Sequence, residues 1–260
     1  MMNNIAVVLR GHYRTWGYVH PAVFDFYDKI AENVDYYIVT WRYPNQSAIS
    51  FTEPFKKYKK NLVKFLTVYP DDAYYTSYLG ASYLSYQIIP DMLVNHHKNK
   101  YDFVFNTRPD IIYKARDNSP KLTFKQDTLY TSGYVCQPDG RPDSTHHIGV
   151  EDHFFASSFE NNLIMNTRHY EIETMGCHNQ ILHHATQYGI KTAALYNMFA
   201  RIVRPTAFRE CRNPLEYFDV DNFAISLKWT TMEKENKLKV LKKYGIPEQD
   251  YITNSILAKI

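Results

Sequence analysis

Residues 5–10 read IAVVLR, and GHYRTW follows them at residues 11–16. The first six residues are an almost continuous apolar run, which predicts a strand buried on both faces. A second run of this kind, DYYIVTW, occupies residues 35–41, and residues 21–33 between the two runs carry apolar side chains at helical spacing. This strand–helix–strand order predicts an α/β fold.

The alternation continues along the chain. Further strands are expected at 65–69, 101–105, 129–135, 154–158 and 193–200, and helices at 55–64, 81–98, 160–175, 178–188 and 226–244. Residues 136–150 are polar with two prolines and two glycines, which predicts a loop. We therefore expect one α/β body with a mostly parallel central sheet flanked by helices. Its catalytic core would span residues 1–205, with a C-terminal helical extension, residues 206–260, packed on it.

Composition narrows the functional classes. Hydrophobic residues make up 45% of the chain and charged residues 22%, values typical of a folded globule. A net charge of +3 is too small to predict a nucleic-acid binder. No apolar run approaches 18 residues, so no membrane span is expected. Three cysteines are too few for a disulfide framework, and we expect a cytoplasmic location.

The first candidate site directly follows the first strand. Ligands of open α/β sheets bind at the carboxyl ends of strands. Arg10 and Arg14 are four residues apart beside Gly11. Forked guanidinium groups match phosphate oxygens, and glycine lets the backbone approach a ligand closely. The segment therefore indicates a diphosphate site, with an ordinary surface loop as the alternative.

The second candidate is the segment 106–110, which reads NTRPD, at the end of the 101–105 strand. Asp110 would close this strand after Arg108, where its carboxylate could hold Mg²⁺, Mn²⁺ or a sugar hydroxyl. The alternative is that Arg108 and Asp110 pair with each other at the surface.

The third candidate opens the strand at 154–158. Glu151 and Asp152 precede that strand, and either carboxylate could act as a general base. Because neighbouring side chains of a strand point to opposite faces, we expect only one of them to face a given cleft.

The order of these motifs resembles a known family. The segment RGHYRTW at 10–16, a second strand ending in Thr40–Trp41, YDFVFNTRPDIIY at 101–113 and VEDHFFASS at 150–158 together resemble small glycosyltransferases of viral and bacterial polysaccharide gene clusters. The resemblance covers residues 4–205 and implies a GT-A-like fold, a nucleoside-diphosphate sugar as donor and a glycan or other hydroxyl acceptor. For a viral protein it implies the host cytoplasm.

The resemblance also implies roles for individual residues. Arg10, Gly11, Arg14 and Trp41 would lie on the nucleotide side of the donor, and Arg108 and Asp110 on its diphosphate, cation or sugar. Asp152 would face the acceptor as the base, with Glu151 as the fallback. One departure is that Asn106 stands where the family's R-x-R-x-D segment has its first arginine, which removes a cationic contact.

Two other functions stay open at this point. One is a metal-dependent hydrolase that uses Asp110, Asp152 and His153. The other is a non-catalytic carbohydrate-binding module, in which some of the 23 tyrosines serve as platforms for sugar rings.

Overall fold

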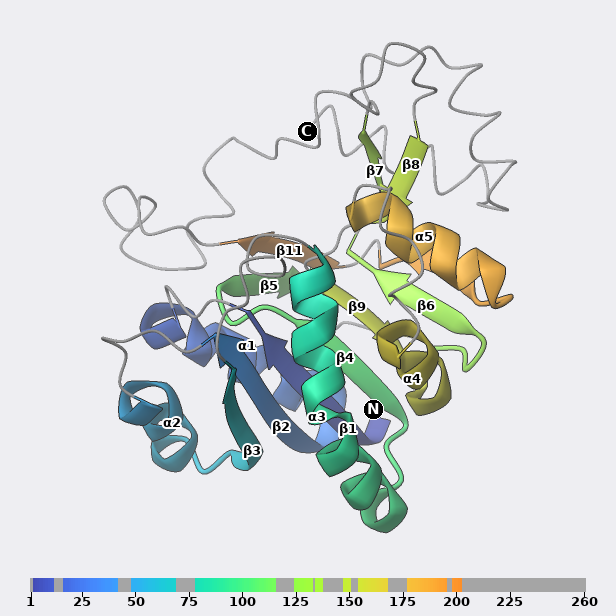
Figure 1. Ribbon diagram of the computed structural model, residues 1–260. Helices are drawn as coiled ribbons and strands as arrows, with labels where there is room; N and C mark the ends of the chain where they lie inside the picture. The colour runs from blue at the N-terminus through green and yellow to red at the C-terminus, as the bar shows by residue number, and fades with distance from the viewer. Residues whose placement is uncertain are drawn as a thin grey trace, which may run out of the picture.

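A computed structural model gives the fold of the 260-residue chain (Figure 1). It describes residues 2–11, 16–41, 48–68, 78–115, 124–132, 134–137, 147–150, 154–167, 177–195 and 198–202. The expected C-terminal extension at 206–260 lies outside the described residues.

A seven-stranded sheet forms the centre of the molecule, in the order β10–β6–β9–β4–β1–β2–β3. In chain order its strands are β1 (Met2–Arg10), β2 (Ala31–Trp41), β3 (Asn61–Val68), β4 (Phe103–Thr107), β6 (Thr128–Thr131), β9 (Phe154–Ser157) and β10 (Lys191–Ala194). Neighbouring strands are parallel except at β9, which runs antiparallel to both β4 and β6. The predicted α/β fold with a mostly parallel central sheet is confirmed.

Strand β1 lies between β2 and β4 and is buried from Ile5 to Arg10, where each residue is at most 1% exposed. From β1 the chain adds β2 and β3 on one side and then returns to the other side with β4. In open α/β sheets such a reversal of strand order leaves a crevice at the carboxyl ends of the two strands concerned. Here those strands are β1 and β4.

Helices cover both faces of the sheet. The first face carries α1 (Trp16–Ile30) and α2 (Ala48–Lys57), and the second carries α3 (Tyr78–Asn99) and α4 (Phe159–Thr167), with α3 in front of the sheet in Figure 1. A further helix, α5 (Cys177–Gln187), contacts β10 and β8. Along β1 alternate side chains enter the two apolar clusters, as the pleat of a strand requires.

Two small antiparallel pairs of strands accompany the main sheet, and the second pair corrects the expected loop at 136–150 and the expected strand at 129–135. Strand β5 (Ile111–Ala115) pairs with β11 (Met198–Ile202), and β7 (Tyr134–Gln137) pairs with β8 (His147–Val150). The expected loop at 136–150 therefore begins and ends in strands. The expected strand at 129–135 is likewise two strands, β6 and β7, which belong to different sheets.

The boundary between α2 and β3 is also corrected, because residues 61–64 belong to the strand and not to the helix. Lys59 adopts a left-handed conformation with a φ of 52°, the position usually taken by glycine at a helix end. The amide N–H of Lys60 donates to Phe55 O at 2.8 Å and that of Lys59 to Lys56 O at 3.2 Å, which is the Schellman pattern of helix termination.

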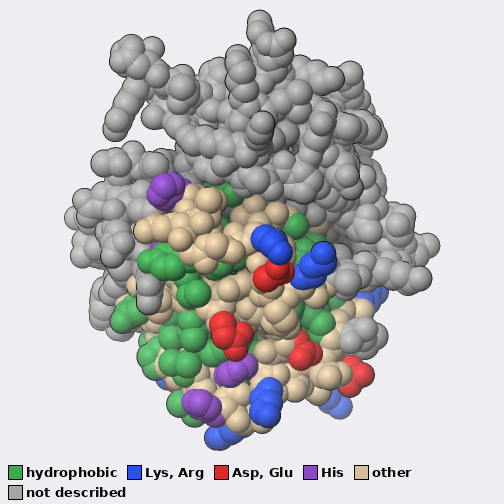
Figure 2. Space-filling model, turned by 90° about the vertical axis from the view of Figure 1, so that its right-hand side faces the viewer, with side chains coloured by type: hydrophobic (Ala, Val, Ile, Leu, Met, Phe, Trp, Pro, Cys, Tyr) green, Lys and Arg blue, Asp and Glu red, His purple; other side chains and the backbone are tan. Residues whose placement is uncertain are grey.

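Among the described residues no helix is long and apolar enough to cross a membrane. On the face seen in Figure 2, the basic and acidic side chains of the described residues are interspersed and do not gather into one patch.

Trp16 joins the two helices of the first face and generates a stability prediction. It is fully buried, stacks on Phe51 and Phe55 with centroids 5.3 and 5.5 Å away, and donates from Nε1 to Phe51 O at 3.0 Å. We expect Trp16→Ala to lower the free energy of unfolding by about 3–5 kcal/mol, measured by urea denaturation. Ile49→Ala on α2, where the side chain is 72% exposed, should change it by less than about 0.5 kcal/mol. Equal effects of the two substitutions would contradict this role of Trp16.

Candidate functional site

The carboxyl ends of β1 and β4 bring the first two candidate segments together. Leu9 lies opposite Thr107 in the register of these strands, so Arg10 and Arg108 are the next residues in line on each. The reversal of strand order between β1 and β4 falls at the same place. Two segments that are about 100 residues apart in the sequence therefore meet where α/β sheets bind their ligands.

Arg10 is the last residue of β1, and its side chain is 1% exposed. Its Nη1 donates to Ser85 Oγ on α3 at 3.3 Å, and its guanidinium carbon lies 4.8 Å from the ring centroid of Phe155 on β9. A guanidinium above an aromatic ring is attracted by the negative face of the ring. The contacts from α3 and β9 thus fix the position of this cation at the end of the central strand.

Gly11 follows Arg10 with a φ of 99°, a conformation that side-chain-bearing residues rarely adopt. Its N–H donates to Val39 O of β2 at 3.1 Å, which extends the ladder between β1 and β2 by one bond. The positive φ of Gly11 ends the regular strand conformation directly after Arg10. The expected role of Gly11, to let the backbone approach a ligand closely, stays a prediction.

Asn106 occupies the same face of β4 as Val8 and Arg10 do on β1, because it lies opposite Val8 in the register. Its side chain is fully buried, yet neither Nδ2 nor Oδ1 has a hydrogen-bond partner among the described residues. Leaving a buried polar group without a partner costs about 1–3 kcal/mol. An amide in this state next to a buried arginine is the feature of this edge that most needs a ligand to explain it.

Arg108 and Asp110 pair with each other across the turn that joins β4 to β5. Arg108 Nε donates to Asp110 Oδ1 at 2.8 Å and Nη2 donates to Oδ2 at 2.9 Å, the two-bond geometry of a forked pair. Asp110 is fully buried and the Arg108 side chain is 23% exposed, so this is not the surface pair that was the alternative. The segment 101–113 is not one continuous strand, and the turn, not strand alternation, brings the two side chains together.

The divalent-cation role of Asp110 stays a prediction. Both carboxylate oxygens of Asp110 accept from Arg108, so the residue as it stands does not fit a cation ligand. Within the described ranges, no three His, Cys, Asp or Glu side chains are grouped as a metal site would need.

Trp41 ends β2 and is 3% exposed. It belongs to the apolar cluster on the α3 face, together with Val39, Leu84 and Ile88. Its nucleotide-side role therefore stays a prediction, since the indole is buried among apolar side chains.

Four residues of the sequence-based site, Arg14, Glu151, Asp152 and His153, lie outside the described residues. Strand β9 starts at Phe154, which lies opposite Thr107, the last residue of β4. Because β9 is antiparallel to β4, its first residue is at the carboxyl edge of the parallel strands, the edge that carries Arg10 and Asn106.

Sequence analysis missed two members of this site. Ser85 comes from α3 and Phe155 from β9, and both contact Arg10. Ser85 has no motif around it, since a serine within an amphipathic helix gives no signal of its own. Asn106 was noted only as a departure from a family motif. A polar residue near the end of a buried apolar strand is nevertheless a recognisable signal of a site.

Neither a protein-family model nor a curated protein matches this sequence. Among solved structures, the chain is similar to the inositol-1-phosphate CTP transferase from T. maritima, with 8% sequence identity and a TM-score of 0.46. The match covers 95% of this chain and 98% of that chain. No residue role or activity is carried over from a similarity of this size.

The Arg108–Asp110 pair generates the second prediction. Arg108→Ala leaves a buried carboxylate without its cation, so we expect the free energy of unfolding to fall by about 3 kcal/mol, measured by urea denaturation. Arg108→Lys should give an intermediate loss, because an ammonium group cannot form the fork.

The exposed pair of Lys64 and Asp91 supplies the control. Their side chains are 39% and 36% exposed and their charged atoms are 3.0 Å apart. Lys64→Ala should cost no more than about 1 kcal/mol. If Arg108→Ala costs as little as Lys64→Ala, the pair does not anchor this turn.

Proposed function

We propose that the chain is a nucleotide-sugar-dependent glycosyltransferase that binds its donor at the carboxyl ends of β1 and β4. The observation that carries this proposal is the buried amide of Asn106, which has no partner among the described residues and lies on the same face as Arg10. A donor nucleotide would offer this amide the hydrogen-bond acceptors and donors that the protein itself does not supply.

Arg10 has the properties needed to hold a diphosphate. A nucleoside diphosphate leaves with additional negative charge, which the protein must stabilise in the transition state. The guanidinium of Arg10 is held by Ser85 and Phe155 before any ligand arrives, so little reorganisation is needed on binding. Helices α1 and α3 have no acidic residue in their first turns, so no carboxylate in those turns neutralises the positive ends of the helix dipoles.

Arg108 has a second role in this proposal. Its fork to Asp110 fixes the turn after β4, and its side chain remains partly exposed at that turn. Arg10 then takes the part that a divalent cation plays in other transferases, and Arg108 fixes the turn beside it. No step is assigned to Mg²⁺ or Mn²⁺.

Asp152 is the proposed base. The segment that contains it is covalently continuous with Phe154, and two residues of chain span at most about 7 Å. The acceptor hydroxyl gives its proton to the carboxylate, and its oxygen forms a bond to the anomeric carbon of the donor. The bond from that carbon to the diphosphate breaks, and the nucleoside diphosphate leaves with the electron pair. Glu151 is the fallback for the same proton transfer.

Ligand binding separates this proposal from the two other functions. A transferase binds nucleoside diphosphates with or without EDTA, whereas a metal-dependent hydrolase needs its metal. A carbohydrate-binding module ignores nucleotides altogether. A panel of UDP, GDP, CDP and ADP, followed by thermal unfolding, therefore distinguishes the three.

The third prediction concerns the donor pocket. A nucleoside diphosphate at 100 times its dissociation constant adds about 2.7 kcal/mol, which raises the melting temperature of a chain this size by roughly 5–10 °C. We expect Arg10→Ala to abolish this rise, and the exposed Lys98→Ala on α3 to leave it unchanged. A full rise in Arg10→Ala would contradict the assignment.

Asn106→Leu tests the buried amide directly, because leucine has the same branched shape as asparagine. Without ligand we expect this variant to be as stable as the parent chain or more so, since a buried polar group without a partner is removed. With nucleotide we expect the rise in melting temperature to disappear. A variant that is strongly destabilised without ligand would show instead that the amide is satisfied within the protein.

The fourth prediction concerns Asp152. We expect Asp152→Asn to lower transfer from the nucleotide sugar by about 10²–10⁴-fold with the nucleotide-induced melting shift retained, because a base acts on the chemical step. The measurement is turnover, followed as release of the nucleoside diphosphate. Near-normal turnover in Asp152→Asn, together with a loss in Glu151→Gln, would move the role to Glu151.

A further inference from the structure

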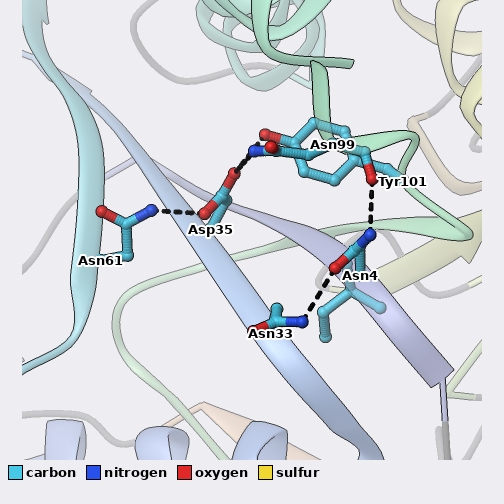
Figure 3. A pocket seen from close by; sticks show the side chains of 7 residues that line it. Asn4, Asn33, Asp35, Asn61, Asn99 and Tyr101 are labelled. Carbon is cyan, nitrogen blue, oxygen red and sulfur yellow. Dashed lines mark hydrogen bonds between the residues drawn. The ribbon is translucent and has the colours of Figure 1, made fainter. Parts of the chain in front are cut away.

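A second polar pocket lies at the opposite edge of the sheet, where the parallel strands begin (Figure 3). Its volume is about 320 Å³, and its lining residues are Asn4, Ile5, Asn33, Asp35, Asn61, Asn99 and Tyr101. Arg10 lies six positions after Asn4 on β1, and a strand rises about 3.3 Å per residue, so this pocket is roughly 20 Å from the candidate donor site. It belongs to neither of the sites described above.

A buried carboxylate organises the pocket. Asp35 is 7% exposed and accepts hydrogen bonds from Nδ2 of Asn61, from Nδ2 of Asn99 at 2.8 Å and from the hydroxyl of Tyr101 at 2.6 Å. Figure 3 shows Asn61 and Asn99 approaching Asp35 from two sides. Burial, with the hydrogen bond to Asp35, raises the pKa of Tyr101 far above its usual value, so its hydroxyl remains a donor.

The carboxylate also fixes which way the asparagine amides face. An ionised carboxylate only accepts hydrogen bonds, so Asn61 and Asn99 must turn their NH₂ groups toward Asp35. Asn33 is fixed in the same way, because its NH₂ group donates to Asn4 Oδ1 at 3.0 Å and to the Asn3 carbonyl oxygen at 3.4 Å. The Oδ1 atoms of Asn33, Asn61 and Asn99 accept no hydrogen bond from any described residue.

The pocket is therefore lined by asparagine amides whose NH₂ groups are already engaged, around a buried carboxylate. This surface favours a ligand that donates several hydrogen bonds, and the absence of a cationic side chain among its lining residues disfavours phosphates and carboxylates. The volume is about ten times the roughly 30 Å³ that a water molecule occupies in the liquid, which is far more than a single metal ion fills. A neutral ring with several hydroxyl groups fits both conditions.

We propose that this pocket binds a neutral sugar unit through the asparagine side chains that line it, Asn33, Asn61 and Asn99. The inference goes beyond the proposed transferase function and does not depend on it, because the two sites lie at opposite edges of the sheet. Tyr101 is 5% exposed and offers no open aromatic face, so the affinity is expected in the millimolar range.

Ligand-observed NMR with methyl α-glucoside, methyl β-galactoside and N-acetylglucosamine at millimolar concentration tests the proposal. We expect at least one of the three to bind, and Asn33→Ala and Asn61→Ala to weaken that binding tenfold or more. Asn33→Ala removes only exposed hydrogen bonds and should keep the melting temperature of the parent chain. Asn61→Ala removes a hydrogen bond to the buried Asp35 and should lower the melting temperature, so binding is measured well below its transition. Asn95→Ala on α3, whose side chain does not line the pocket, is the matched control and should bind as the parent does.

The same experiment distinguishes this pocket from the candidate donor site, and sugar binding from Ca²⁺ binding. Saturating UDP should leave sugar binding unchanged, and Arg10→Ala should retain it even if nucleotide binding is lost or was never present. EDTA should have no effect. The proposal is overturned if none of the three sugars binds, if Asn33→Ala and Asn61→Ala bind as the parent does, or if Ca²⁺ alone binds and is lost in those variants.

Discussion

The burial of β1 constrains everything else in this molecule. Its central residues have strands on both sides and helices over both faces, so no polar side chain can reach solvent along its length. Chemistry is therefore restricted to its two ends. At one end stand Arg10, the left-handed turn at Gly11 and the buried amide of Asn106 on the next strand. At the other end Asn4 joins a network of amides around Asp35. The two ends differ in charge as well, one cationic and the other rich in hydrogen-bond acceptors.

Sequence reasoning succeeded where a single physical pattern dominates. The apolar runs of β1, β2 and β4 are visible because strands buried on both faces have few other compositions. It failed where the local signal is unusual. Lys59 ends α2 in a conformation that normally calls for glycine, so a lysine-rich segment looked like a continued helix. Strand β5 was not expected, although its apolar residues directly follow the turn at 108–110.

The residue types of the candidate site could be read from the sequence, but the burial and the contact partners of those residues could not. Arg10, Gly11, Arg108 and Asp110 all follow apolar strands, and strand ends are recognisable in a sequence. Their burial and partners depend on register, which sets contacts between residues up to about 100 positions apart and leaves no local trace. The Asp35 pocket was missed for the same reason, since its asparagines come from β1, β2, β3 and the end of α3 and form a group only after the strands align.

The orientation of β9 has a consequence for how the protein opens. In the described sheet, β6 and β10 reach the other strands only through β9, and β9 contacts β6 over just two register positions, Tyr130 with Ala156 and Thr131 with Phe155. Its ladder with β4 is twice as long, running from Val104 to Thr107. Segments that are held by fewer contacts open locally at a lower free energy. We therefore expect the β6–β10 pair to open more readily than β1, so that its amide hydrogens exchange with solvent faster than those of β1.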